Sequence, residues 1–101
     1  MIMELMIEKI KKIQNKQQSL MWGSALYNNN EVVFAVRNKA YPKQPHFFSV
    51  TDTYTVNMIN DYNKRILFKE CEDLQDVLSC VISLLKEWFP AKGITENNDK
   101  Q

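Results

Sequence analysis

Two amphipathic segments lie at the ends of the globular part of this chain, and both have the apolar periodicity of an α-helix. In residues 1–18 the apolar side chains recur at i, i+3, i+4 and i+7, while lysines take most of the remaining positions. A wider apolar stripe runs from Leu74 to Trp88, and Pro90 then stops the helix. We expect each stripe to cover a sheet. A membrane-surface helix at residues 1–18 is disfavoured because the stripe is short and has no Trp anchor.

Between these segments the apolar positions alternate with the period of two that is typical of half-buried strands. The stretch "SLMWGSALYNNNEVVFAVRN" predicts a hairpin, with its turn at residues 28–30 because Asn tolerates positive φ. Residues 47–60 predict one long or bent strand with a Thr-rich face toward water. Asp52 falls on the apolar side of that strand, which predicts a bulge or break near residues 51–53. A short strand, "RILFKE", follows a turn.

The predicted order is therefore α-β-β-β-β-α. Short consecutive strands favour an antiparallel meander, and each helix has one stripe to bury. We expect an α+β fold of two layers, with both helices packed on one face of the sheet. Residues 1–90 form the predicted single domain, and the polar residues 91–101 form a flexible tail.

Composition and charge exclude several classes of protein. Apolar residues make up 45% of the 101 residues, enough for a globular core, and the net charge is only +1. Residues 1–43 carry seven Lys/Arg and three Asp/Glu, whereas residues 44–101 carry six and nine, so the second part is acidic. We find no signal peptide and no apolar run of the roughly 18 residues that span a bilayer. The sequence predicts a cytoplasmic protein with reduced thiols.

Both cysteines lie in the stretch "CEDLQDVLSC", which raises the possibility of a thiol or metal site. A helix through both would separate Cys71 from Cys80 by about 13 Å and place them on opposite sides. If Cys71 instead lies just before the helix, we still expect the two residues to be too far apart to bond. A disulfide requires Cα atoms within about 7 Å, so we expect none. A single histidine and no second thiol pair argue against zinc.

No phosphate-binding glycine loop or nucleophile motif is present, so the sequence predicts no enzyme activity, no cofactor and no small-molecule substrate.

Two groups of residues remain as candidate partner-binding positions. The acidic group, Glu70, Glu72, Asp73 and Asp76, precedes and opens the last predicted helix. Its carboxylates either balance the helix dipole or form a docking patch for a basic partner. The second group consists of loop residues, because loops carry binding residues more often than strands. These residues are Tyr41, His46 and Tyr62.

The order of elements, the Asn/Lys/Ile-rich composition and the strand-to-helix stretch "RILFKECEDLQDVLSCVISLL" resemble small bacterial immunity proteins of the contact-dependent growth inhibition type. The resemblance covers residues 1–90 and carries no shared motif, so no site residue is transferred from it. It implies a cytoplasmic protein that binds and blocks a cognate toxin. Family members commonly lay acidic patches over a basic nuclease site, and the acidic group is the candidate counterpart here.

Two other functions stay open. An antitoxin, a phage-type inhibitor or a small chaperone would need the same kind of protein-binding surface. A double-stranded RNA-binding domain has a similar order of elements, but it needs lysines at the start of its last helix, where this chain has acids. Nucleic acid is therefore the less favoured partner.

Overall fold

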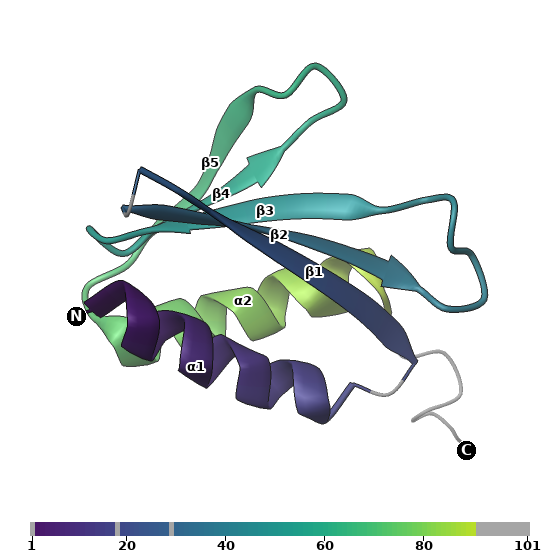
Figure 1. Cartoon of the computed structure of the whole chain (residues 1–101), viewed down its shortest axis with the longest axis horizontal. Helices are drawn as coiled ribbons and strands as arrows, with labels where there is room; N and C mark the ends of the chain where they lie inside the picture. The colour runs from purple at the N-terminus through teal and green to yellow at the C-terminus, as the bar shows by residue number, and fades with distance from the viewer. Residues whose placement is uncertain (1, 18, 29, 91–101) are drawn as a thin grey trace.

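The computed structural model describes residues 2–17, 19–28 and 30–90. Two helices enclose a run of five strands in the sequence (Figure 1). The predicted tail, residues 91–101, lies outside the described residues. The elements are α1 (Ile2–Asn15), β1 (Leu20–Tyr27), β2 (Glu31–Asn38), β3 (His46–Thr51), β4 (Thr55–Ile59), β5 (Arg65–Glu70) and α2 (Leu74–Trp88).

The five strands form one antiparallel sheet in the order β1-β2-β3-β4-β5, and both helices lie on the same side of it (Figure 1). The predicted α+β class and two-layer arrangement are confirmed. The predicted hairpin is confirmed too, and Asn28 in its turn has a φ of 55°.

The predicted count of four strands is wrong, because residues 47–60 form two strands rather than one. The chain turns at residues 52–54, where Tyr54 has a φ of 66° and its N–H donates to the Thr51 carbonyl at 3.1 Å. The Thr51 hydroxyl oxygen accepts from the backbone N–H of Thr55 at 3.1 Å, which ties the turn together. The break predicted from Asp52 is therefore present, and it is a complete reversal of direction.

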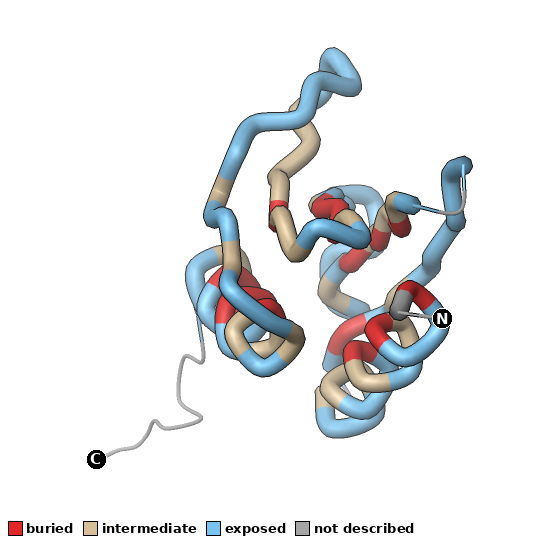
Figure 2. Tube along the Cα trace, turned by 90° about the vertical axis from the view of Figure 1, so that its left-hand side faces the viewer, coloured by how far each residue is buried: buried red, intermediate tan, exposed pale blue. Residues whose placement is uncertain are grey.

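The core fills the space between the helices and the inner face of the sheet (Figure 2). At its centre the rings of Phe34 and Phe48 stack at 5.0 Å, and Trp22 packs edge-on against both. Burial of these apolar side chains is the main driving force for this arrangement. The helices contribute Met3, Met6 and Ile10 from α1 and Val77, Val81, Leu84 and Leu85 from α2.

The sheet curls strongly toward its outer face, which is the face away from the helices. Glu31 pairs with Thr51 at one end of β3, whereas Arg65 reaches Phe47 at the other end of β3 through Ile59. In a flat sheet these two residues would lie about 14 Å apart across the strands and about 13 Å along them. Their side chains nevertheless form an ion pair at 3.1 Å. Strand twist must therefore bring the β4–β5 hairpin over the outer face, and Figure 1 shows this hairpin rising from the sheet.

Candidate functional site

The acidic group lies where β5 meets α2, and two of its four carboxylates serve the helix start. Asp73 is the N-cap of α2, and its side chain accepts a hydrogen bond from the N–H of Asp76 at 2.8 Å. Asp76 accepts from Lys69 Nζ at 2.9 Å and from the N–H of Glu72 at 3.1 Å. Glu70 and Glu72 are exposed. Their carboxylates make no hydrogen bond or ion pair with the part of the chain that the structure describes.

Electrostatics at this junction follow from these contacts. The hydrogen bond from Lys69 lowers the pKa of Asp76 below its usual value, and the bond from the Glu72 N–H lowers it further. The same contact raises the pKa of Lys69. Asp76 is thus a paired carboxylate at neutral pH. The part of the acidic group that is free to meet a basic partner consists of Glu70 and Glu72.

The two cysteines are free thiols, but the expectation that they lie on opposite sides of a helix is wrong. Cys71 precedes α2, and its N–H donates to the Tyr54 carbonyl at 2.9 Å, while Cys80 is buried within α2. Burial is the main cause that raises the pKa of each thiol, to about 12 for Cys80. The nearby Cys71 raises the pKa of Cys80 further. They are neighbours because the chain between Glu70 and Leu74 is not helical, so the helical separation does not apply.

The three candidate loop residues lie in different places. Tyr41 is 63% exposed in the β2–β3 loop, and Tyr62 is 83% exposed in the β4–β5 turn. His46 begins β3, where its ring stacks on Trp88 at 4.9 Å and meets Phe89 edge-on at 5.3 Å. His46 thus helps to hold the end of α2 against the sheet.

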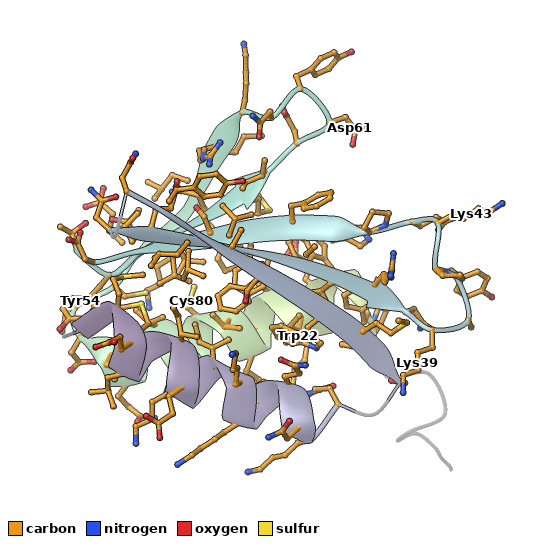
Figure 3. The ribbon with its side chains drawn as sticks, viewed as in Figure 1. Trp22, Lys39, Lys43, Tyr54, Asp61 and Cys80 are labelled. Atoms are coloured by element: carbon orange, nitrogen blue, oxygen red, sulfur yellow. The ribbon has the colours of Figure 1, made fainter. Side chains whose placement is uncertain are left out.

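The structure does not bring the predicted positions together into one surface. The acidic group is at the start of α2, whereas His46 contacts its end, about 22 Å away for a helix of 15 residues. Tyr62 lies at the far end of β4 from the turn beside the acidic group. Figure 3 shows the same separation, with Asp61 on the β4–β5 tip and Tyr54 at the opposite side of the molecule.

A surface that the sequence analysis missed lies on the concave outer face of the sheet. We call it the outer-face hollow; its volume is about 410 Å³. Its floor is apolar and its rim is polar, with the Glu31–Arg65 ion pair beside it. Leu67, 54% exposed, lies on the same face of β5. The residues that line the hollow are Tyr27, Val33, Phe47, Ile59, Asn60, Asp61, Asn63 and Arg65.

A signal for this hollow was present in the sequence. Val33, Phe47 and Ile59 each stand next to a core residue of the same strand, at positions that strict alternation would give to polar residues. Apolar residues at such positions indicate a sheet that carries apolar residues on both of its faces. The rim could not be found in the same way, because it depends on the curl of the sheet.

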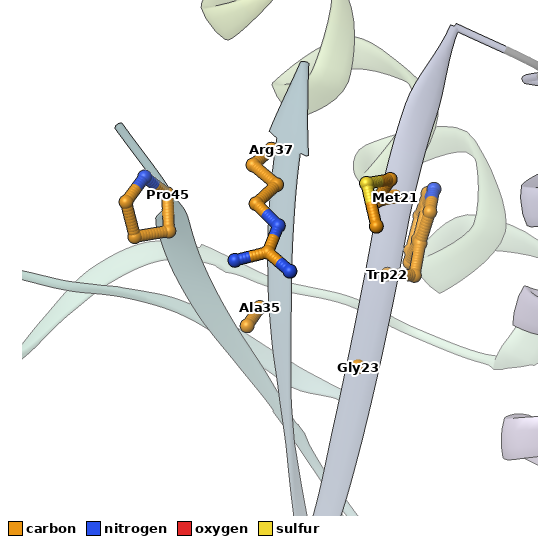
Figure 4. A pocket seen from close by; sticks show the side chains of 6 residues that line it. All are labelled: Met21, Trp22, Gly23, Ala35, Arg37 and Pro45. Atoms are coloured by element: carbon orange, nitrogen blue, oxygen red, sulfur yellow. The ribbon is translucent and has the colours of Figure 1, made fainter. Parts of the chain in front are cut away.

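A smaller hollow of about 180 Å³ lies at the other end of the outer face (Figure 4). Arg37 extends across β2 between Met21 and Pro45, and its guanidinium contacts the Pro42 carbonyl at 3.5 Å. A single cation above an apolar floor can attract a carboxylate, but the other described residues that line this hollow offer no second charged group to orient such a ligand. This hollow extends the apolar surface of β1 and β2 and offers no catalytic group.

Within residues 2–17, 19–28 and 30–90, no three His, Cys, Asp or Glu side chains are grouped so that they could hold a metal ion. Among the same residues, no helix has the length and apolar character needed to cross a bilayer.

Comparison with protein-family models, with curated proteins and with solved structures found no match to this chain. The resemblance to immunity proteins was based on an order with four strands between two helices, whereas the observed order has five. Layout alone does not identify a family, since one fold serves many functions.

Proposed function

We propose that this chain is a non-catalytic protein-binding module that acts by covering part of a partner protein. The outer-face hollow carries this proposal. Exposed apolar patches with a polar rim mark interaction sites on soluble proteins, and aromatic side chains such as Tyr27 and Phe47 are enriched in them. A concave floor of this kind fits a convex apolar projection, such as a loop or the face of a helix.

The most specific form of the proposal is an immunity protein that binds and blocks a bacterial toxin in the cytoplasm. Its support is the resemblance drawn from the sequence together with the two exposed carboxylates, Glu70 and Glu72. Carboxylates at the edge of an interface would speed association with a basic toxin and contribute less to affinity. An antitoxin, a phage-type inhibitor or a small chaperone is the alternative. RNA binding is less favoured, because the start of α2 is acidic.

The direct test is co-expression with the candidate partner. If the neighbouring gene encodes a large secreted toxin, this chain should restore growth to cells that express the toxic C-terminal domain. Titration calorimetry of the purified pair should then show a saturable complex. Growth arrest that persists at full expression of this chain, with no heat of binding, would contradict the immunity function.

Variants then separate the two candidate surfaces. Phe47→Asp and Leu67→Asp place charges on the outer face and should weaken binding at least tenfold. Leu5→Asp, a similar change at an exposed position of α1, is the matched control and should bind normally. Glu70→Lys with Glu72→Lys tests the acidic surface without disturbing the cap at Asp73. Circular dichroism should show an intact fold in every variant, so that lost binding reports on the surface.

A further inference from the structure

The two edges of the sheet differ in how they are protected. Edge strands expose unpaired backbone groups, and most proteins shield them with charges, prolines or bulges. β5 carries Arg65, Lys69 and Glu70, and a bulge at Phe68 interrupts its pairing with β4. β1 has the sequence LMWGSALY, with no charge and no proline, and it pairs with β2 through eight continuous residues. The β1 edge therefore lacks these protections.

The alternation of hydrogen bonds between β1 and β2 shows which backbone N–H and C=O groups of β1 point outward at this edge. The N–H of Lys39 donates to the carbonyl of Ser19 at 2.9 Å, so the odd-numbered residues of β1 hydrogen-bond to β2. The N–H and C=O groups of Trp22, Ser24 and Leu26 therefore point away from β2. No strand among the described residues lies on that side. Leu20 faces the same way, but its N–H already donates to the carbonyl of Gln17 at 3.0 Å.

We propose that β1 pairs with β1 of a second copy of this chain, antiparallel and centred on Ser24, to make one continuous sheet. Antiparallel edge strands are related by a two-fold axis through one residue, as in a closed dimer. Centring on Ser24 places Trp22 opposite Leu26 of the partner, so every outward N–H and C=O of these residues meets a complementary group. Centring on Gly23 would instead require the N–H of Leu20, which is already used.

The side chains of β1 fit the same register. On the helix side, Leu26 is 47% exposed at the edge of the sheet, and Trp22 of the second copy would cover it. On the outer face, Met21 would lie opposite Tyr27, both now exposed. The centre of the strand carries the small residues Gly23, Ser24 and Ala25, and the space around Gly23 is open, since an added side-chain carbon there would meet nothing within 4 Å. No like charges face each other, because β1 has none.

Sedimentation equilibrium of the full chain over micromolar to millimolar concentrations tests this proposal. The apparent mass should rise from 11.9 kDa toward twice that value. Ser24→Lys places two like charges opposite each other across the axis and should weaken association at least tenfold, and Ser24→Glu should do the same. An equal mixture of the two variants should associate again, because the opposing charges are then opposite in sign. The matched control, Ser83→Lys at an exposed position of α2, should associate like the wild type.

Three results would overturn the proposal. They are a wild type that stays monomeric throughout, association that Ser24→Lys leaves unchanged, and a mixture that fails to recover. Ser24 is exposed, so a folded variant is expected, and circular dichroism checks it. The proposal is independent of the protein-binding function, since self-association is measured without any other partner.

Discussion

At the scale of single residues, Trp22 combines packing that stabilises the fold with a polar group that destabilises it. The indole Nε1 of Trp22 is buried and has no hydrogen-bond partner among the described residues, although its ring contacts Phe34 and Phe48. A buried donor without an acceptor costs roughly 1–3 kcal/mol. The ring therefore contributes packing, while its N–H opposes stability.

We expect Trp22→Phe to change the free energy of unfolding by less than about 1 kcal/mol, because loss of the unpaired N–H offsets loss of ring volume. Trp22→Ala should cost about 3–5 kcal/mol through loss of packing. Urea denaturation followed by circular dichroism measures both. A large loss of stability in Trp22→Phe would mean that Nε1 has an acceptor in solution.

The thiols lead to a prediction about pH. Burial raises the pKa of Cys80 from 9.0 to about 12, so the folded state favours the neutral thiol. The associated stability is present below pH 9, where the unfolded thiol is also neutral, and is lost as the pH rises toward 12. Native protein should react with iodoacetamide at pH 8 much more slowly than urea-unfolded protein, as mass spectrometry can follow. Equal rates in the two states would show that Cys80 is accessible.

At the scale of elements, periodicity predicted both helices and the first hairpin, because these features depend on neighbouring residues. The break at residues 52–54 was located but underestimated, since the positive φ of Tyr54 is not typical of an aromatic residue. Two features were missed: the proximity of the two thiols to each other, and the outer-face hollow. Both depend on how separate elements meet: β5 enters α2 without helical geometry, and the β4–β5 hairpin curls over β2.

The start of α2 provides the clearest test of an element. Asp73→Ala removes the side chain that accepts the Asp76 N–H, and it should lower the free energy of unfolding by about 1 kcal/mol. Glu72→Ala, one residue earlier at an exposed position, is the matched control and should stay within about 0.5 kcal/mol of the wild type. Chemical denaturation measures both variants. Similar losses would show that general charge, and not the cap, stabilises this end of the helix.

At the scale of the whole molecule, the concave shape of the outer face depends on how the β4–β5 hairpin is held. Most of the sheet is fixed by the core beneath it, but the tip of this hairpin lies beyond the helices (Figure 1). Asn60 organises the tip by accepting backbone hydrogen bonds from Tyr62 and Lys64. The Glu31–Arg65 pair then connects the hairpin to β2 through two side-chain hydrogen bonds, at 3.1 and 3.2 Å.

We therefore expect Arg65→Met to loosen the hairpin without unfolding the protein. Partly exposed ion pairs contribute only about 0.2–1 kcal/mol, so global stability should change within that range. Hydrogen exchange should become faster for the β4–β5 amides and stay unchanged in β2 and β3, because local opening requires only the hairpin to move. Glu31→Gln should give the same pattern, and the double variant should add little to either single one. Unchanged exchange in all three variants would mean that backbone twist alone holds the hairpin over the hollow. In that case the twist of the sheet alone produces the concave surface, and the ion pair at its rim does not stabilise it.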